Sequence, residues 1–305
     1  MQVQVNEQTL EVSNLDKVFW PDEGFSKADV LNYYTQVSVY LLPHLQDRPI
    51  VLVRYPDGIK GKHFYQKECP KYAPQWVPTV SIEHSNKEVN YCLCNNLQTL
   101  LWMINQGSIE IHPWLSRYNN SNNPDYMVFD LDPAPLSPFR DVIFLALRLK
   151  AALEEFGLQG FLKTSGASGL HIYVPIKAIY PYSLITKAAG YLSNMVAEAY
   201  PKQATVERLV KNRKDLIYLD YLQNGRGKTI VSVYCLRPRP KAPVSIPITW
   251  EEISRNGAID NFFPVDFNIQ TTLDRLKETG DLFAQVLSLK QDLGELLRMI
   301  NSKLH

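Results

Sequence analysis

The sequence predicts an α+β fold, in which antiparallel strand pairs lie beside helices, and two observations support this class. Strand-like hairpins are interspersed with helical segments, whereas a doubly wound parallel sheet would require strands and helices to alternate regularly. Hydrophobic residues make up 45% and charged residues 21% of the 305 residues, which is typical of a globular protein. We therefore expect mixed and antiparallel sheets flanked by helices.

The N-terminal third of the sequence is predicted to hold two helices and a strand. Ser26 suits the N-cap of a helix over 27–42, whose apolar residues recur at helical spacing. Asn95 is expected to start a second helix, which Gly107 would end. The strand-like segment IEIHPW follows. The polar segment 116–124 then marks a predicted lobe boundary.

Beyond this boundary, strand patterns and helix patterns alternate with turns. The expected elements are a buried strand over 126–130, a helix from Ser137-Pro138 to Gly157, a hairpin with strands near 161–164 and 170–174, a helix over about 182–200, a strand pair formed by LIYLDYL and TIVSVYCLR, and a helical tail from about Thr249.

Charge and length exclude several classes of protein. The 32 Lys and Arg residues against 31 Asp and Glu residues give a net charge of +1, which argues against a uniformly basic nucleic-acid coat protein. The N-terminus lacks the basic and apolar regions of a signal peptide. The best apolar run, from Val142 to Leu147, is far shorter than the roughly 20 residues of a membrane span. We expect a soluble, cytoplasmic protein.

Three aspartates at the ends of predicted strands are candidate ligands for divalent cations. Asp130 and Asp132 are two residues apart on one strand, so their side chains would point to the same face, about 6–7 Å apart. Asp220 ends a second apolar strand, LIYLD. Carboxylate oxygens are preferred ligands of Mg²⁺ and Mn²⁺, and three carboxylates would suit a two-metal site. The alternative is structural, because Asp132-Pro133 is also a common turn dipeptide.

The segment TSGASGLH predicts a turn that could bind an anion. Gly166 and Gly169, with Ser165 and Ser168, would allow backbone N–H groups to form an anion-binding concavity. His171 follows where the chain re-enters a strand, and its ring could present a donor nitrogen to phosphate oxygens. The simpler alternative is a hairpin turn followed by a strand histidine that a neighbour satisfies.

A basic stretch over 202–241 favours a polyanionic partner. It contains ten Lys and Arg residues against three acids. Lys228, Arg237 and Arg239 are cations that suit phosphate. The two arginines are expected to share one face of a strand, which the proline after each of them would keep extended. A solvated surface strand is the alternative.

An acidic tail offsets this basic stretch. From Glu251 to Arg298, nine acids accompany five bases. The net charge of +1 is therefore a cancellation, and it does not exclude a local surface for nucleic acid. Carboxylates for hard cations, together with cations for phosphates, favour phosphoryl or nucleotidyl transfer. The residues themselves leave open whether the protein is a polymerase, a nuclease or a kinase-like transferase.

Five ordered motifs resemble a known family. They are NLDKVFWPDEGFSKADVLNYY, EIHPWLSR, YMVFDLDP, KTSGASGLHIYVP and LIYLDYLQNGRGKTIVSVYCLRPRPKAPVSIPITWEE. Together they resemble the polymerase domain of the prokaryotic non-homologous end-joining ligase, ligase D, in the archaeo-eukaryotic primase superfamily. The resemblance implies a primase-polymerase fold in a single module over 1–305, with an N-terminal lobe (1–115), a catalytic palm-like lobe (116–248) and an acidic helical tail (249–305).

The same resemblance implies the residues of a nucleotidyltransferase site. Asp130, Asp132 and Asp220 would bind two divalent ions, Mn²⁺ or Mg²⁺, that activate a primer 3′-hydroxyl and stabilise the leaving pyrophosphate. A larger set would bind the incoming NTP or dNTP. That set comprises Ser165, His171, Lys228, Arg237 and Arg239 on the triphosphate, Phe64 or Tyr65 on the base, Gln223 and Asn224 at the sugar or phosphate, and His112 near the reacting centre, for which a core histidine is the alternative. Family members favour ribonucleotides, so contacts to the 2′-hydroxyl are expected.

The resemblance also implies a DNA-binding site near the N-terminus. Asn14, Lys17 and Lys27 match the positions with which this family grips a 5′-phosphate at a DNA gap or recessed end. Lys27 would begin the first predicted helix, whose N-terminus adds partial positive charge. Arg54 is a further candidate DNA contact. For the lysines, a solvated charged surface is the alternative.

Two positions depart from the family pattern. Ser168 stands where many relatives carry Lys or Arg, and Val53 stands where some relatives have a basic residue. Each missing phosphate contact should lower the affinity for DNA or nucleotide and reduce its sensitivity to salt. We therefore expect weaker binding than is typical of the family.

The function implied by the resemblance is a template-directed primase-polymerase that adds nucleotides, preferably ribonucleotides, to a primer at gaps and double-strand-break ends in non-homologous end joining. The expected partners are DNA with a 5′-phosphorylated gap or end, nucleoside triphosphates, a Ku-like end-binding protein and a separate DNA ligase. No membrane partner is expected, and the location would be the nucleoid region of the cytoplasm. The alternatives are a metal-dependent nuclease and a non-catalytic DNA-end-binding module.

Overall fold

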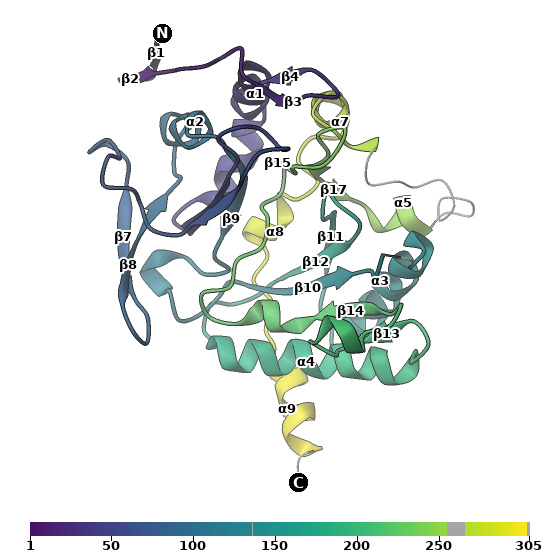
Figure 1. The fold of residues 1–305 in the computed structure, drawn as a ribbon. Coiled ribbons are helices and arrows are strands. Elements are labelled where there is room, and N and C mark those ends of the chain that lie inside the picture. The colour runs from purple at the N-terminus through teal and green to yellow at the C-terminus, as the bar shows by residue number, and fades with distance from the viewer. Residues whose placement is uncertain (136, 255–265, 304–305) are drawn as a thin grey trace. The chain divides into compact units, whose positions relative to one another are not determined.

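The computed structural model describes residues 1–135, 137–254 and 266–303, and it confirms the α+β class (Figure 1). The chain divides into two compact units. Unit 1 comprises Met1–Asn119, Thr229–Ser245 and Val265–Gly280, and unit 2 comprises Asn120–Lys228, Ile246–Pro264 and Asp281–His305. The first boundary lies inside the polar segment 116–124.

These units divide the chain differently from the three predicted lobes. Residues 229–245 belong to unit 1, where the backbone N–H of Ser232 donates to the carbonyl of Ile111 over 2.9 Å. The predicted tail is shared, because Val265–Gly280 belongs to unit 1 and Asp281–His305 belongs to unit 2. Each unit is thus built from separated stretches of chain, which a division into consecutive lobes does not anticipate.

Unit 1 combines short antiparallel strands with helices. Its elements are β1 (Gln2–Val5), β2 (Gln8–Glu11), β3 (Val18–Trp20), β4 (Phe25–Ser26), α1 (Lys27–Leu45), β5 (Pro49–Arg54), β6 (Phe64–Gln66), β7 (Thr79–Glu83), β8 (Glu88–Leu93), α2 (Leu97–Asn105), β9 (Ser108–Pro113), β15 (Cys235–Leu236), β16 (Val244–Ser245) and α7 (Thr271–Thr279). The 3₁₀ turn η1 (Tyr118–Asn120) follows β9 and contains the first boundary. β1 pairs with β2, β3 with β4 and β15 with β16, and the larger sheet has the order β6-β5-β8-β7, with β9 also paired to β5.

Apolar packing against the larger sheet of unit 1 fixes the strands that carry candidate residues. Val51, Ile82, Val89, Tyr91 and Trp114 form one buried cluster. β-branched and aromatic side chains of this kind pack well on a pleated surface. The cluster includes a residue of β5 and the residue that follows β9, so it holds these two strands together.

The predicted N-cap of helix α1 is confirmed. The Ser26 hydroxyl accepts from the backbone N–H of Asp29, and the carboxylate of Asp29 accepts from the backbone N–H of Ser26, which completes a capping box. The helix runs to Leu45 and includes Pro43, beyond its predicted end. Pro43 lacks the N–H that would bond to the carbonyl of Val39, and Val39 is exposed, so water can satisfy that carbonyl.

Unit 2 is built on a mixed sheet with the order β13-β14-β10-β12-β11-β17. Its elements are β10 (Tyr126–Asp132), α3 (Phe139–Glu154), β11 (Phe161–Thr164), β12 (Leu170–Pro175), α4 (Tyr182–Ala199), β13 (Ala204–Thr205), η2 (Val210–Asn212), β14 (Ile217–Asp220), η3 (Tyr221–Asn224), β17 (Pro247–Ile248), α5 (Trp250–Ser254), α8 (Gln285–Ser288) and α9 (Gly294–Ser302). β13 pairs parallel to β14, and the other strand pairs are antiparallel. Helices α3 and α4 pack against the sheet (Figure 1).

Most elements predicted from local signals are confirmed. β10 contains the predicted strand and extends to Asp132, and β11 and β12 form the predicted hairpin. Helices α3 and α4 match their predicted ranges within a few residues. Helix α2 begins after the cap residue Asn96, one residue later than predicted, and the turn after it uses Gly107 at φ 81°. Local caps and turn residues therefore located these elements well.

The predicted hairpin between LIYLDYL and TIVSVYCLR is wrong. β14 pairs with β10 and β13 instead. After β14 the chain enters the 3₁₀ turn η3, where the carboxylate of Asp220 accepts from the backbone N–H of Leu222. β15 covers only Cys235–Leu236 and pairs with β16 in unit 1. The reason for the error is that apolar periodicity identifies a strand but does not identify its partner.

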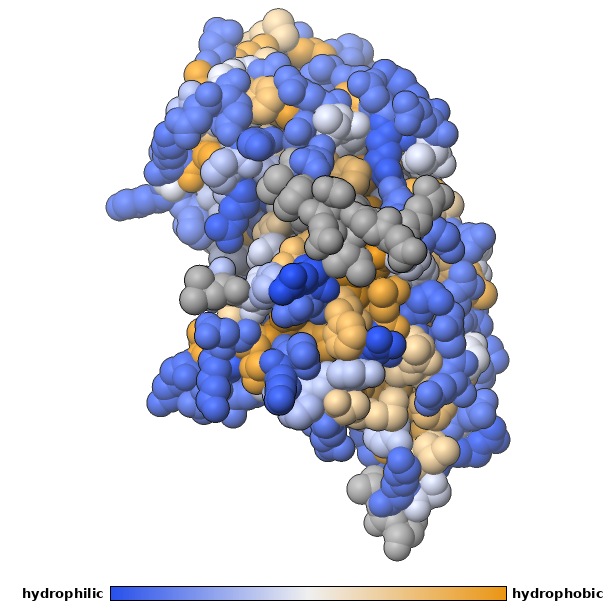
Figure 2. Space-filling model, turned by 90° about the vertical axis from the view of Figure 1, so that its right-hand side faces the viewer, coloured by the Kyte–Doolittle hydropathy of each residue, from blue (hydrophilic) through white to orange (hydrophobic). Residues whose placement is uncertain are grey.

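Hydrophilic side chains cover much of the face drawn in Figure 2, and hydrophobic side chains gather in smaller areas between them. Among the residues that the structure describes, none of the helices combines the length and the apolar character needed to cross a membrane. The predicted acidic tail is helical in α5, α7, α8 and α9. Two of its counted charges, Arg255 and Asp260, lie outside the described residues.

Candidate active site

One row of polar side chains crosses neighbouring strands of the unit 2 sheet. Asp130 of β10 lies opposite His171 of β12 on one side and opposite Asp220 of β14 on the other. Lys163 of β11 lies opposite His171 in turn. Directly paired residues of antiparallel strands point to the same face, with Cβ atoms about 4.5–5.5 Å apart. The register therefore brings the four side chains together on one face.

Asp132 joins this group through the two-residue period of β10. It is exposed and lies opposite Tyr218 of β14. The Tyr218 hydroxyl donates to Oδ1 of Asp220 over 3.0 Å, and the guanidinium carbon of Arg213 lies 3.7 Å from the centre of the Tyr218 ring. The sequence pattern places Arg213 only in the basic stretch, whereas the structure connects it to the carboxylates through Tyr218.

The surroundings of Asp220 disfavour its negative charge. Burial raises the pKa of Asp220 above its usual value, and the nearby charge of Asp130 raises it further. The hydrogen bonds from Tyr218 and Leu222 and the charge of Lys228 act in the opposite direction but do not cancel the effect. The ionised carboxylates are therefore held together at a cost in free energy.

Oxygen donors that repel one another in this way fit a hard divalent cation. A bound cation would relieve the repulsion between Asp130 and Asp220 and would find its preferred ligands there. Within residues 1–135, 137–254 and 266–303, no group of three or more His, Cys, Asp or Glu side chains is already assembled as a metal site. Mg²⁺ usually binds one or two protein carboxylates and completes its shell with water and substrate phosphates. The two facing carboxylates of Asp130 and Asp220 are therefore enough to supply the protein ligands of such an ion.

Both ring nitrogens of His171 contact protein groups. Its Nε2 lies 3.2 Å from Oδ1 of Asp130, and its Nδ1 lies 2.8 Å from Nζ of Lys163. A lysine ammonium only donates, so Lys163 makes Nδ1 the acceptor and directs the Nε2 proton toward Asp130. Lys163 is 0% exposed. Sequence reasoning misses Lys163, and its one signal is a lysine in the middle of an otherwise buried strand.

The predicted anion-binding turn is closed by Ser165. The Ser165 hydroxyl oxygen accepts from the backbone N–H groups of Ala167 and Gly169, at 3.1 and 3.0 Å. Two of the amides expected to face an anion are therefore directed at this hydroxyl. Gly166 has φ 69°, in the left-handed region. A Cβ at Gly169 would lie 2.3 Å from the carbonyl oxygen of Leu131, so the close approach of this turn to β10 requires glycine.

Asn224 has a structural role, which corrects its prediction as a nucleotide contact. It is 0% exposed, and its Oδ1 accepts from the backbone N–H of Val128 over 2.8 Å. Its Nδ2 donates to the carbonyls of Val128 and Tyr221, at 2.7 and 2.9 Å. The carboxamide is fully used inside unit 2, so it braces β10 two residues before Asp130. The neighbouring Gln223 is half-buried.

In unit 1, a buried carboxylate joins two of the predicted nucleotide-binding side chains. Oε2 of Glu110 lies 2.9 Å from Nε2 of His112, and Oε1 lies 2.6 Å from Nε of Arg237. Burial opposes the charge of Glu110, but the hydrogen bonds and charges of His112 and Arg237 outweigh it and lower the pKa of Glu110 to about 2. Sequence reasoning misses Glu110, although Glu-x-His on a strand places both side chains on one face.

Arg237 and Arg239 lie in a turn, not on the predicted extended strand. β15 ends at Leu236, and the backbone N–H of Arg239 donates to the carbonyl of Arg237 over 2.8 Å. Lys241 and Ala242 have φ values of 69° and 48°, and there the chain turns back so that β16 pairs with β15. The proline after each arginine lacks the N–H that a longer strand would need.

Strand β6 presents its two aromatic candidates to opposite faces of the sheet. Tyr65 lies opposite Val53 of β5, and Val53 lies opposite Glu110 of β9, so these three share one face. Phe64 lies opposite Arg54, whose guanidinium carbon is 5.2 Å from the centre of the Phe64 ring. Tyr65 is therefore on the face of the Glu110 cluster, and Phe64 is on the face of Arg54. Val53 is 1% exposed in this row.

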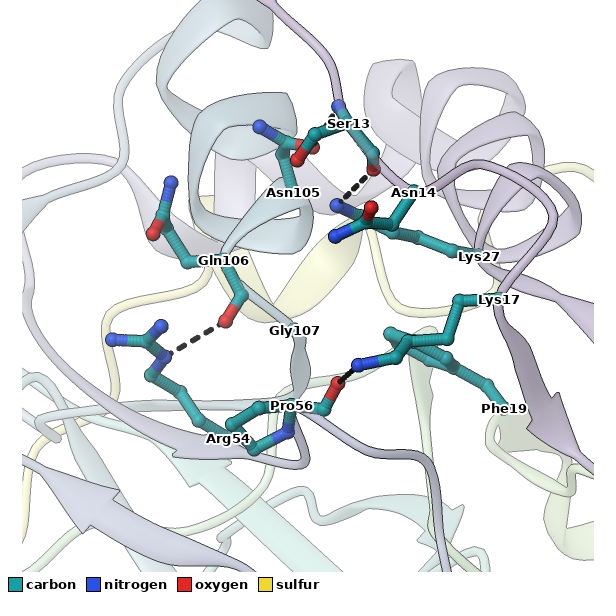
Figure 3. A pocket seen from close by; sticks show the side chains of 10 residues that line it. All are labelled: Ser13, Asn14, Lys17, Phe19, Lys27, Arg54, Pro56, Asn105, Gln106 and Gly107. Atoms are coloured by element: carbon teal, nitrogen blue, oxygen red, sulfur yellow. Dashed lines mark hydrogen bonds between the residues drawn. The ribbon is translucent and has the colours of Figure 1, made fainter.

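The residues predicted to bind DNA line a single pocket of about 200 Å³ in unit 1 (Figure 3). The cations in its wall come from separate segments of unit 1. The pocket is lined by Ser13, Asn14, Lys17, Phe19, Lys27, Arg54, Pro56, Asn105, Gln106 and Gly107. The structure thus brings together the four predicted residues, which are Asn14, Lys17, Lys27 and Arg54.

Backbone carbonyls hold each cation of the pocket. Nζ of Lys17 donates to the carbonyl of Pro56 over 2.8 Å and also contacts Asp57. Nζ of Lys27 donates to the carbonyl of Ser13 over 2.6 Å, and Nε of Arg54 donates to the carbonyl of Gln106 over 2.9 Å (Figure 3). Burial, followed by the charge of Lys17, lowers the pKa of Lys27 to about 8. An anion in the pocket would relieve that repulsion.

The predicted residues divide between the two units. Unit 2 holds Asp130, Asp132, Asp220, Ser165, His171, Gln223, Asn224 and Lys228. Unit 1 holds Asn14, Lys17, Lys27, Arg54, Phe64, Tyr65, His112, Arg237 and Arg239. Unit 2 brings Asp130, Asp220 and His171 into one row. Unit 1 brings one group into the pocket with Arg54 and another, His112 and Arg237, onto Glu110.

Comparison with known proteins gives consistent matches over most of the chain. A sequence model of the LigD primase-polymerase domain matches residues 26–283. The bifunctional non-homologous end joining protein LigD of Bacillus subtilis is 33% identical over 297 residues, which cover 96% of this chain and 47% of that protein. The multifunctional LigD of Mycolicibacterium smegmatis is 32% identical, over 91% of this chain and 36% of that protein. The chain therefore spans less than half the length of these two relatives.

A solved structure extends the likeness to the fold. The polymerase domain from Mycobacterium tuberculosis ligase D, in complex with DNA, matches with a TM-score of 0.85 and 26% sequence identity. The match covers 93% of this chain and 100% of that domain. The sequence similarity and the fold similarity thus lead to the same group of proteins.

Proposed function

Because this chain belongs to the LigD primase-polymerase domain family, we propose that it is a template-directed polymerase that extends a primer 3′-hydroxyl at DNA gaps and double-strand-break ends. Members of the family are nucleotidyltransferases of DNA repair. The relatives in B. subtilis and M. smegmatis are non-homologous end joining proteins, and the solved relative is a polymerase domain bound to DNA. These relatives support placing the chain in end joining.

One observation carries the proposal, which is the row of Asp130, Asp220 and His171 across the unit 2 sheet. Burial and the charge of Asp130 make the ionised form of Asp220 costly unless a cation binds it. The ring of His171 beside these carboxylates would turn its Nε2 proton from Asp130 to a phosphate oxygen when a cation binds that carboxylate, and the charge of Lys228 reaches the same site. This combination suits the transfer of a nucleotidyl group from a triphosphate.

We assign the metal site to Asp130, Asp132 and Asp220, with Mn²⁺ or Mg²⁺ as the ion. When bound, such ions lower the pKa of the attacking hydroxyl and stabilise the charge that develops on the leaving pyrophosphate. Tyr218 and the backbone N–H of Leu222 fix the orientation of the Asp220 carboxylate. Ser165, His171 and Lys228 bind the triphosphate from unit 2.

The unit 1 residues are assigned to the remaining parts of the substrates. Tyr65 stacks on the base of the incoming nucleotide, because it shares a face with the Glu110 cluster that holds His112 and Arg237. Arg237 and Arg239 bind the triphosphate. The pocket of Lys17, Lys27, Asn14 and Arg54 takes the 5′-phosphate at a gap or recessed end, and Phe64 lies on the same face as Arg54.

The preferred nucleotides and the partners complete the proposal. Ribonucleotides are the expected substrates, recognised through the 2′-hydroxyl. A Ku-like end-binding protein and a separate DNA ligase are the proposed partners, since end joining needs end recognition and sealing as well as synthesis.

A primer-extension assay on a gapped duplex with a 5′-phosphate tests the proposal. The wild-type chain should lengthen a labelled primer, and the comparison of rNTP with dNTP and of Mn²⁺ with Mg²⁺ gives its preferences. A shortened primer would instead indicate a nuclease, and DNA binding without any change in primer length would indicate a non-catalytic end-binding module. The variant with both Asp130→Ala and Asp132→Ala should lose extension and keep its binding to the 5′-phosphorylated end. Extension by that variant would refute the metal assignment.

A further inference from the structure

Glu110 lies between an imidazole and a guanidinium that the proposed function assigns to the nucleotide. We propose that Glu110 is a positioning residue, which orients His112 and Arg237 for the triphosphate of the incoming nucleotide. The inference rests on the proposed function for the identity of the ligand. It rests on the structure of unit 1 for the contacts themselves.

Each oxygen of the Glu110 carboxylate contacts a different side chain. Oε2 contacts Nε2 of His112 at 2.9 Å, and Oε1 contacts Nε of Arg237 at 2.6 Å. Contact through Nε fixes the plane of the guanidinium and so the directions of its two terminal nitrogens. A fork of terminal nitrogens is the part of a guanidinium that binds two oxygens of a phosphate. Glu110 therefore sets the direction of this fork.

Burial makes this contact rigid. Glu110 is 5% exposed, and the side chain of His112 is 13% exposed while that of Arg237 is 19% exposed. The carboxylate is on β9, whose pairing with β5 fixes its backbone. Arg237 is on the turn after β15, and its backbone N–H donates to the carbonyl of Pro243 over 2.8 Å. The Glu110 carboxylate adds a fixed, buried partner for the side chain of this arginine.

A purely structural ion pair is the alternative explanation. Apolar residues of similar volume often replace such pairs without loss of stability, so the need for stability alone does not explain a buried carboxylate that contacts both a guanidinium and an imidazole. The neighbouring side chains favour a ligand-binding role. Tyr65 shares the face of Glu110. Burial, followed by the charges of Glu110 and Tyr65, raises the pKa of Tyr55 to about 12, and the charges of Arg237 and Arg239 oppose this rise. The cluster thus places a guanidinium and an imidazole beside an aromatic ring.

The Glu110→Gln variant of the full chain tests the inference, with ATP opposite a template dT on a gapped duplex as the probe. A carboxamide has one acceptor oxygen, so it can keep only one of the two contacts, and its NH₂ group would face a second donor. We expect KM for ATP to rise about 10- to 100-fold, which corresponds to the loss of one charge-assisted hydrogen bond. The value of kcat should change less than about threefold, and the affinity for 5′-phosphorylated DNA should stay at the wild-type level.

Matched variants make the result specific. Glu7→Gln removes an exposed carboxylate of the same unit and should leave KM for ATP unchanged. If Glu110 acts through Arg237, the combination of Glu110→Gln with Arg237→Met should have nearly the same KM as Arg237→Met alone. This double variant carries no lone buried charge, so it also serves if Glu110→Gln alone does not fold. Additive effects in the double variant would overturn the inference.

Direct binding of ATP, measured by calorimetry without primer, separates the inference from the proposed function. A wild-type chain that extends primers and a Glu110→Gln variant with unchanged KM would overturn the inference and leave the function intact. A wild-type chain that binds ATP but does not extend primers would overturn the function, and a weaker affinity for ATP in Glu110→Gln would still support the positioning role. Equal loss of ATP affinity and DNA affinity in Glu110→Gln would indicate general damage to unit 1 and would also overturn the inference.

Discussion

At the residue scale, the row of Asp130, Asp220 and His171 across the unit 2 sheet places negative charge where burial disfavours it. Asp220 is flanked by Asp130, and its pKa is raised, first by burial and then by that neighbouring charge. The folded state therefore binds a proton at Asp220 more tightly than the unfolded chain does. It follows that the stabilising contribution of this group is present at low pH and is lost as pH rises through its folded pKa. Above that pH the ionised group opposes folding.

Asp220→Asn should therefore make the protein more stable and inactive. The hydrogen bonds from Tyr218 and Leu222 to the carboxylate both use Oδ1, which a carboxamide oxygen can replace. We expect the free energy of unfolding at pH 7 to rise by about 0.5–2 kcal/mol, measured by urea unfolding. Primer extension should be lost. The stability gain should shrink as pH falls into the ordinary range of a carboxyl group, and the exposed Asp215→Asn should show no such gain. A destabilised Asp220→Asn would contradict this view of the row.

The phosphate pocket predicts a different pH dependence. Lys27 has a pKa of about 8, so its ammonium group loses its proton as pH rises from 7 to 9. The preference for a 5′-phosphorylated gap over a 5′-hydroxyl gap should fall severalfold over that interval, measured as a ratio of Kd values. Lys27→Arg stays charged and should keep the ratio constant. Lys17 and Asp57 also face the pocket region, so the ratio must be compared within each variant. The same fall in Lys27→Arg would assign the effect to another group.

Most of these residues could be predicted from the sequence as candidates, but the side chains that they contact could not. Asp130, Asp220 and His171 could be picked out because each ends or begins a strand pattern. Their common row could not, because it depends on the register of strands that are far apart in the chain. Lys163 and Glu110 were missed for the same reason, since a charged residue in a strand is expected on the solvated face unless its partners are known.

At the element scale, the turn between β11 and β12 packs directly against β10, the strand that carries Asp130 and Asp132. Gly169 comes so close to β10 that a Cβ would meet the carbonyl of Leu131 at 2.3 Å. Leu131 lies between Asp130 and Asp132. A side chain at Gly169 must therefore displace either the turn or the strand that carries both carboxylates.

Gly169→Ala should lower the free energy of unfolding by about 1–3 kcal/mol, the usual cost of overpacking, and should also reduce kcat for primer extension. Urea unfolding and steady-state kinetics measure the two effects. Ser168→Ala, at the exposed position of the same turn, should change neither by much. An active, stable Gly169→Ala would show that this approach is not needed for the site.

Elements with local signals were predictable, and elements defined by distant pairing were not. The capping box of α1 and the glycine after α2 depend on only a few neighbouring residues, so these helices could be predicted. The apolar segment TIVSVYCLR has the composition of a strand, yet only Cys235–Leu236 pairs as one. Its other backbone groups bond to partners such as Ile111, which sequence periodicity does not reveal.

At the scale of the whole molecule, the net charge of +1 conceals where the charges lie. The basic stretch 202–241 belongs largely to unit 2, and a cation-lined pocket lies in unit 1. Salt dependence of DNA binding counts the phosphates that specific cations neutralise, with a slope of about −0.7 to −0.9 per contact in a log–log plot. It does not report the total charge of the protein. Two variants with the same net charge can therefore differ in this slope.

Ser168→Lys tests that distinction. Ser168 is exposed in the turn between β11 and β12, at a position where the family resemblance leads us to expect a basic residue. The variant should bind gapped DNA or nucleotide more tightly at low salt and should steepen the salt slope by about 0.7–0.9, because it adds one phosphate contact. Ser302→Lys adds the same charge on α9, at an exposed position outside both groups of site residues, and should leave the slope at the wild-type value. Equal slopes for the two variants would mean that the turn does not approach phosphate, and the departure at Ser168 would then have no bearing on affinity.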